Sequence, residues 1–170
     1  MEKTFSIFEH GGGTRTGLRK IARPFRPGCP VHLTMRAPRA RGSWSFLAPA
    51  HKGIVHLLVL DTAERYDIEL IEWQNVGNHL HLAVRARART KLQAFLRVLP
   101  QRIAVAVTGV GRNRQIGRFW EKPAHTRVLQ TDQELKTVRE YIWKNRLEAL
   151  GFSPKQIAVF RRNASAVPLI

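Results

Sequence analysis

The stretch YDIELIEWQNVGNHLHLAVRA, residues 66–86, decides the fold because it contains two strand-like runs separated by a turn. Gly77 and Asn78 are typical of a short connection, so the two runs are expected to pair as antiparallel strands. Side chains alternate between the two faces of a strand, and those of the second run that are expected to enter the core are Leu80, Leu82 and Val84. His79 and His81 therefore share the opposite face.

The rest of the chain surrounds this hairpin with helix and strand patterns. Apolar spacing predicts a strand at 31–37, a helix at about 49–65, a helix from about Thr90 that Pro100 kinks or divides, an extended segment at 119–129 and a helix from Thr131 to Gly151. The order is strand, helix, strand, strand, helix, strand, helix. This order favours an α+β fold in which helices pack on an antiparallel sheet, as in the ferredoxin-like arrangement.

Length and composition are those of one compact domain with a strong positive charge. The chain has 170 residues, of which 44% are hydrophobic, and a formal net charge of +17 from 29 Lys and Arg against 12 Asp and Glu. Such a charge predicts a polyanionic partner, and the excess of Arg over Lys favours nucleic acid because guanidinium groups make paired bonds to phosphate. A solvated cationic surface or an anionic lipid partner are the alternatives.

The two ends of the chain are expected to differ from its centre. Residues 1–30 combine basic residues with Gly and Pro and lack a sustained apolar period, which predicts a basic, flexible N-terminal arm. The domain itself is expected at 31–151, followed by a basic C-terminal tail at 152–170. The single Cys29 favours a reducing compartment, and no apolar run is long enough to cross a membrane, so we expect a soluble cytoplasmic protein.

The two histidines of the hairpin form a candidate metal site. Strand geometry holds the imidazoles of His79 and His81 side by side on one face, which suits bidentate binding of a divalent metal. Two solvated surface histidines are the alternative, because this short spacing alone is a weak signal.

The helix expected after Thr131 supplies a candidate nucleophile. In its capping box, "TDQE", Thr131 accepts a bond from the amide of Glu134 while the Glu134 carboxylate returns the bond. Tyr141 lies at the edge of the apolar stripe of this helix, and Asn145 lies four residues later on the same side. A phenol and a carboxamide packed near two imidazoles would combine a nucleophile with a metal site. The alternative is a structural tyrosine at the edge of the core.

Three motifs in this order resemble those of the single-tyrosine HUH transposases. They are "NHLHL" at 78–82, "GRFWEKPAHTRVL" at 117–129, and "YIWKN" at 141–145 followed by "EALGF" at 148–152. HUH denotes two histidines that flank a hydrophobic residue, here His79, Leu80 and His81. Over about 31–151 the chain is similar in particular to the IS200-like and REP-associated tyrosine transposases.

This resemblance implies an RRM-like HUH fold and an enzyme that cleaves and rejoins single-stranded or hairpin DNA. The nucleophile of the family corresponds to Tyr141, and its metal ligands correspond to His79, His81 and Asn145. The resemblance further implies Mg²⁺ or Mn²⁺ as cofactor, a 5′-phosphotyrosyl intermediate, and a monomer or homodimer at the bacterial nucleoid.

Other basic and aromatic residues are candidates for contact with DNA: Arg85, Arg87, Arg89, Arg118, Trp120 and Arg127. The first three alternate with alanine after the histidine strand and are interpreted as a phosphate-binding stripe. Trp120 can stack on bases or belong to the core. The alternative functions are a non-catalytic module that binds single-stranded DNA or RNA, and a metal-dependent hydrolase that uses water.

Overall fold

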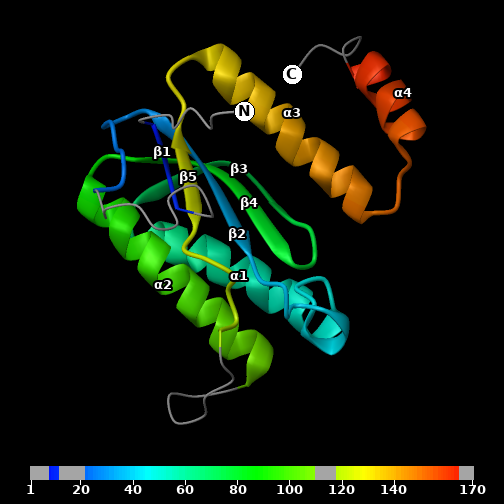
Figure 1. The fold of residues 1–170 in the computed structure, drawn as a ribbon, viewed down its shortest axis with the longest axis horizontal. Coiled ribbons are helices and arrows are strands. Elements are labelled where there is room, and N and C mark those ends of the chain that lie inside the picture. The colour runs from blue at the N-terminus through cyan, green and yellow to red at the C-terminus, as the bar shows by residue number, and fades with distance from the viewer. Residues whose placement is uncertain (1–7, 12–21, 110–117, 165–170) are drawn as a thin grey trace, which may run out of the picture.

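A five-stranded antiparallel sheet with the strand order β1-β5-β2-β4-β3 forms the middle of the protein (Figure 1). The computed structural model describes residues 8–11, 22–109 and 118–164, the last four by their backbone alone. Its strands are β1 (Glu9–His10), β2 (Pro30–Arg36), β3 (Ile68–Asn75), β4 (His79–Ala86) and β5 (His125–Val128). Its helices are η1 (Gly42–Trp44), α1 (Pro49–Arg65), α2 (Arg89–Thr108), α3 (Asp132–Ala149) and α4 (Pro154–Ala164).

The expected α+β class is confirmed, because β2-α1-β3-β4-α2-β5 is the element order of a ferredoxin-like sheet. The predicted hairpin exists as β3 and β4, with Gly77 at a positive φ of 92° in the turn. Pro100 does not divide α2, which runs continuously from Arg89 to Thr108. No helix among the described residues is long and apolar enough to span a membrane.

Hydrophobic clusters on both faces of the sheet hold the helices. On one face, α1 and α2 pack against the strands through a large cluster that includes Leu33, Leu80, Leu82, Val59 and Phe95. On the other face, α3 packs through a smaller cluster of Ala83, Leu129, Val138 and Ile142. The alternation predicted for β4 is therefore confirmed, since Leu80 and Leu82 belong to the first cluster and Ala83 to the second.

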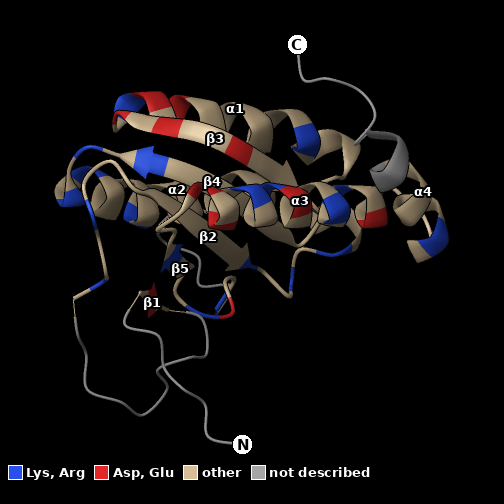
Figure 2. Cartoon of the chain, turned by 90° about the horizontal axis from the view of Figure 1, so that it is seen from above, with Lys and Arg blue, Asp and Glu red and all other residues tan. Residues whose placement is uncertain are grey.

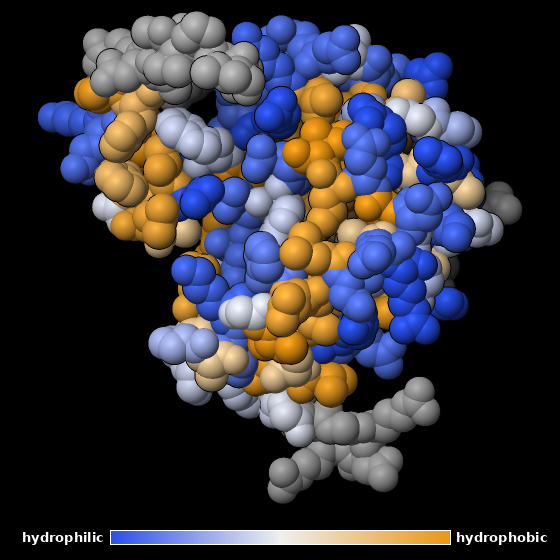
Figure 3. Space-filling view, turned by 180° about the vertical axis from the view of Figure 1, so that it is seen from behind, coloured by the Kyte–Doolittle hydropathy of each residue, from blue (hydrophilic) through white to orange (hydrophobic). Residues whose placement is uncertain are grey.

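The outer side of α1 is apolar as well as its inner side. Ile54, Leu57 and Leu60 expose 39%, 61% and 41% of their surface. Figure 3 shows a stripe of apolar side chains between hydrophilic flanks on the back of the molecule. Because both sides of α1 are apolar, the helical spacing of its sequence identifies the helix but does not identify the side that is buried.

Both chain ends contain more structure than the sequence patterns predict. Glu9–His10 forms β1, which pairs with β5, and the guanidinium of Arg23 donates to the Ala124 carbonyl at 2.8 Å and to Thr126 Oγ1 at 2.5 Å. Pro154–Ala164 forms α4 within the segment expected as a tail. The residues at 1–7, 12–21 and 165–170 lie outside the described part of the chain, and the boundaries 31 and 151 of the expected domain stay a prediction.

The start of α3 is capped, but its second capping bond differs from the predicted one. The amide of Glu134 donates to Thr131 Oγ1 at 3.1 Å, as expected. The Glu134 carboxylate accepts from the amide of Gln130 at 2.6 Å, one residue before the cap, and also from Arg127 at 2.5 Å. The salt bridge to β5 explains this difference, because it draws the carboxylate toward the strand that precedes the helix.

Thr131→Ala removes the side-chain cap and is expected to lower the free energy of unfolding by about 1 kcal/mol. Urea denaturation followed by circular dichroism measures this change. Thr137→Ala is the matched control, because Thr137 is exposed on the same helix and its hydroxyl donates to the Gln133 carbonyl one turn earlier. Equal effects of the two substitutions would show that the cap does not stabilise α3.

Candidate active site on the α3 face of the sheet

The two histidines of β4 lie parallel beneath α3. Their ring centroids are 6.0 Å apart with an interplanar angle of 10°, as the alternation of a strand requires for residues two apart. His81 is 4% exposed, whereas His79 is only partly buried near the start of the strand. The pair therefore presents one covered and one accessible imidazole on the same face.

Tyr141 of α3 stands against this pair. Its ring lies 5.4 Å from the His81 ring at an angle of 85°, so the two rings meet edge to face. The buried neighbours Val138 and Ile142 anchor α3 on Ala83, two residues after His81 on the same strand face. Tyr141 itself stays 45% exposed, which leaves the phenol open to a ligand from solution.

A third imidazole, from His32 of β2, belongs to the same cluster and was not among the residues singled out from the sequence. Its ring centroid lies 6.3 Å from that of His81 and 6.0 Å from that of Tyr141. Its Nε2 is buried and has no hydrogen-bond partner among the described residues. Alternation in "VHLTMR" puts His32 on the face opposite Val31 and Leu33, but only the pairing of β2 with β4 brings it next to His81.

Burial keeps these imidazoles neutral. It lowers the pKa of His81 to about 4, with a further contribution from the charge of His79. Burial also lowers the pKa of His32 to about 4, with contributions from His81, His125 and Arg127. The pKa of His79 is lowered chiefly by burial and then by the nearby Arg36. Neutral imidazoles have the lone pair that a metal requires.

In both histidines of the pair, Nδ1 is the ring atom that makes a hydrogen bond. His79 Nδ1 lies 2.6 Å from Asn78 Oδ1, and because this oxygen only accepts, the ring proton is on Nδ1. His81 Nδ1 lies 3.5 Å from Thr34 Oγ1. The Nε2 atom of His79 is thereby left with a lone pair for a cation, and Asn78 occupies the place of the outer partner that typically orients a metal-binding histidine. Because the Thr34 hydroxyl can donate or accept, its contact with His81 Nδ1 fits either tautomer of that ring.

Asn145 follows Tyr141 by one turn of α3. Its Nδ2 donates to the Tyr141 carbonyl at 2.7 Å, which leaves Oδ1 as the atom with lone pairs for a ligand. Within the described residues no group of three or more His, Cys, Asp or Glu is arranged to hold a metal ion. A complete coordination shell on the two histidines would therefore need an amide oxygen, water or the substrate itself.

Two of the three arginines of the expected phosphate stripe are bound to other parts of the protein. Arg85 donates to both carboxylate oxygens of Glu69 at 2.6 and 2.7 Å, on the strand β3 whose acidic segments Figure 2 shows. Arg89 donates to the Arg23 carbonyl and lies over the Phe25 ring. Arg87 is exposed beyond the end of β4. Their contact with DNA stays a prediction.

The other three candidates for DNA contact lie around β5 and the segment before it. Arg127 lies between two carboxylates, 3.9 Å from Glu9 and 2.5 Å from Glu134. Arg118 is exposed. Trp120 is half-buried, with its ring centroid 5.6 Å from that of Phe46, and its indole donates to the Pro100 carbonyl at 2.9 Å. Arg127 thus connects β1, β5 and α3, and Trp120 belongs in part to the core.

Comparison with known proteins identifies one family. Residues 28–145 match the family described as "Transposase IS200 like". A crystal structure from Deinococcus radiodurans R1, described provisionally as a transposase, is similar over 75% of this chain and 98% of its own, with 14% sequence identity and a TM-score of 0.45. A search of curated protein sequences found no match. The matched range includes both histidines, Tyr141 and Asn145.

The lowered pKa values of the buried histidines predict that the free energy of unfolding decreases as the pH is lowered. Below about 6.5 the histidines of the unfolded chain take up protons, whereas His32 and His81 of the folded chain do so only near 4. The contribution of these two histidines to the free energy of unfolding is therefore full above pH 6.5 and is lost as the pH falls towards 4. Denaturation in the presence of chelator at several pH values measures the slope. His32→Phe should flatten it, and an unchanged slope would contradict the assignment.

Proposed function

The chain belongs to the IS200-like transposase family, and we propose that it cleaves and rejoins single-stranded DNA by transesterification at Tyr141. The observation that carries the proposal is the edge-to-face contact of Tyr141 with His81, 5.4 Å between ring centroids, in a phenol that is 45% exposed. An exposed tyrosine over buried, neutral imidazoles has no evident structural purpose, since the packing of α3 is provided by its neighbours Val138 and Ile142.

In the proposed reaction the Tyr141 oxygen attacks the phosphorus of one phosphodiester. A bond forms between Tyr141 Oη and phosphorus, the bond from phosphorus to the 3′ oxygen breaks, and the departing strand ends in a 3′-hydroxyl. The phenol proton passes to solvent, to which the side chain is open, and the leaving 3′ oxygen takes up a proton from solvent to become that hydroxyl. The 5′-phosphotyrosyl bond keeps the phosphodiester energy, so a 3′-hydroxyl of another strand can attack it and release Tyr141.

The histidine pair is proposed to hold a divalent metal, Mg²⁺ or Mn²⁺, through the two Nε2 atoms, with Asn145 Oδ1 as a third ligand. The fit rests on the bond of His79 Nδ1 to Asn78 and on the neutrality that burial imposes on both rings. When bound, such an ion supplies charge stabilisation to the phosphoryl oxygens during transfer. His79 and His81 would hold the ion, and the edge contact with His81 orients the Tyr141 ring.

Tyr141→Phe removes one oxygen and keeps the packing of the ring. We expect the free energy of unfolding to change by less than about 0.5 kcal/mol, because the hydroxyl is on an exposed side chain. Cleavage should fall by a factor on the order of 10³ or more, as it does when a nucleophile is lost. A denaturing gel of protein with end-labelled single-stranded DNA and Mn²⁺ shows both the cleaved strand and the covalent adduct.

Tyr66→Phe is the control for this experiment, because Tyr66 at the end of α1 is half-buried against the other hydrophobic cluster and should keep both products. An adduct formed by the Tyr141 variant would refute the assignment. Cleavage without an adduct in both variants would favour the hydrolase, and DNA binding without cleavage by the wild-type protein would favour the non-catalytic module.

His79→Ala and His81→Phe are each expected to weaken Mn²⁺ binding at least about 100-fold and to abolish cleavage. Calorimetric titration with Mn²⁺ measures the affinity. The sequence predicts that neither histidine enters the core, but His81 is 4% exposed beneath α3. Alanine at this position would leave a cavity, so phenylalanine replaces His81. His56→Ala is the matched control, since His56 packs on Trp73 at 5.2 Å, away from the candidate active site. Wild-type affinity in either site variant would remove the metal site.

A further inference from the structure

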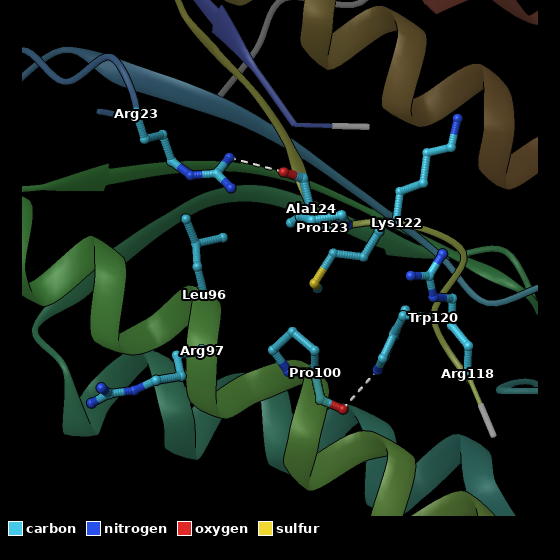
Figure 4. Close-up of a pocket in the computed structure, with 10 residues that line it drawn as sticks. Arg23, Leu96, Arg97, Pro100, Arg118, Trp120, Lys122, Pro123 and Ala124 are labelled. Carbon is cyan, nitrogen blue, oxygen red and sulfur yellow. Dashed lines mark hydrogen bonds between the residues drawn. The ribbon is translucent and has the colours of Figure 1, made fainter. Parts of the chain in front are cut away.

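A pocket of about 380 Å³ lies away from the candidate active site, between α2 and the segment that leads into β5 (Figure 4). Its volume is near the lower limit of the range for small-molecule sites. The residues that line it are Arg23, Met35, Leu96, Arg97, Pro100, Arg118, Trp120, Lys122, Pro123 and Ala124. Arg118 and Trp120 are among the sequence-based candidates for DNA contact, but the sequence does not group them with the other lining residues, because the lining comes from four separate stretches of the chain.

The inner surface of this pocket is apolar and held in place by hydrogen bonds. Met35 is 2% exposed and belongs to the main core, and Leu96 and Pro100 come from α2. The Trp120 indole is tied to the Pro100 carbonyl at 2.9 Å, and Figure 4 shows this bond closing one side of the pocket. A proline and an indole at a fixed separation offer flat apolar surface to a planar group.

Cations surround the apolar surface. Arg97, Arg118 and Lys122 are exposed, and in Figure 4 the guanidinium of Arg118 reaches inward whereas Lys122 extends away from the centre. Arg23 is fixed at the inner end by its bond to the Ala124 carbonyl. The described lining includes four cations and no carboxylate, so the pocket selects a ligand that combines a planar apolar group with an anion.

The segment that builds the pocket also reaches the candidate active site. The amide of Glu121 donates to the Arg36 carbonyl at 2.9 Å, and the two side chains form a salt bridge at 3.4 Å. Arg36 is the residue of β2 that lies opposite His79 of β4. A single strand of DNA that passes the two histidines can therefore continue along this segment, over the end of β2, to Arg118 and Trp120.

The geometry points to a binding site for one unpaired nucleotide of the DNA strand, with its base against Pro100 and Trp120 and its phosphate at Arg118. This inference rests on the proposed function for the source of the nucleotide. Aromatic side chains and arginine are the groups with which proteins hold unpaired bases and their phosphates. A base in this pocket fixes the register of the strand relative to Tyr141, through the short path from Glu121 to His79.

Two variants of the full chain test the site by fluorescence anisotropy with a labelled thymidine strand and an abasic strand of equal length. Leu96→Trp fills the pocket and is expected to weaken binding of the thymidine strand roughly 10-fold, because one stacked base is lost. The abasic strand should bind this variant as tightly as it binds the wild type. Arg118→Ala should weaken both strands and lower the slope of log K against log salt by about 0.7. Arg65→Ala, an exposed cation at the end of α1, is the control for loss of charge alone.

An unchanged affinity of Leu96→Trp for the thymidine strand would overturn the site, and so would equal losses for both strands. Arg118→Ala tests the site even if Leu96→Trp does not fold, because Arg118 is exposed and its loss should not disturb the fold. Equal slopes of log K against log salt for Arg118→Ala and the wild type would also refute the site. Free thymidine monophosphate is expected to compete only weakly, and competition as strong as that of the strand would show a site for free nucleotides instead.

The covalent adduct of the wild-type protein separates this inference from the proposed function. A normal adduct together with unchanged binding by both pocket variants would remove the pocket and keep the transposase chemistry. Conversely, strand-specific loss in Leu96→Trp without any adduct in the wild type would keep the pocket and remove Tyr141 as nucleophile.

Discussion

The antiparallel pairing of β2 with β4 is the constraint on which the rest of the structure depends. It places Leu33 opposite Leu82 on one face, and Thr34 opposite His81 on the other. A slip of one residue would turn the leucines toward α3 and the imidazoles into the main core, at the cost of burying polar rings without partners. The same pairing brings His32 to His81, so one set of backbone bonds builds both the core and the histidine cluster.

The candidate active site exists because α3 can approach the sheet closely. Ala83 is fully buried beneath the helix, and its small side chain lets Val138 and Ile142 settle on β4 next to His81. A larger residue there would lift α3 and with it Tyr141. The Glu134–Arg127 salt bridge and the Thr131 cap fix the N-terminal end of the helix, so the phenol is positioned by contacts at that end and at the middle of α3.

The net charge of +17 overstates the number of cations available to a polyanion. Arg85 and Arg127 lie on carboxylates, and Arg23 and Arg89 donate to backbone carbonyls. Arg side chains bridge strands and helices here because their several donors can satisfy protein acceptors and retain charge. Among the exposed cations of the pocket at Trp120, Arg118 makes one long bond of 3.4 Å to the Glu121 carbonyl, and no carboxylate lies among the described residues that line the pocket.

Local sequence patterns determined the elements of the central fold, the shared face of His79 and His81, the cap of α3, and the motifs that identify the family, since each of these depends on spacing within one segment. The tertiary structure alone decided what depends on pairing between distant segments. β1 joins the sheet through β5, and His32 reaches Tyr141 from more than a hundred residues away in the sequence. Likewise, the salt bridge of Arg85 joins β4 to β3, that of Arg127 joins β5 to α3, and the pocket at Trp120 lies between α2 and the segment before β5. Hydrogen bonds and salt bridges form between neighbours in space and leave no periodicity in the chain.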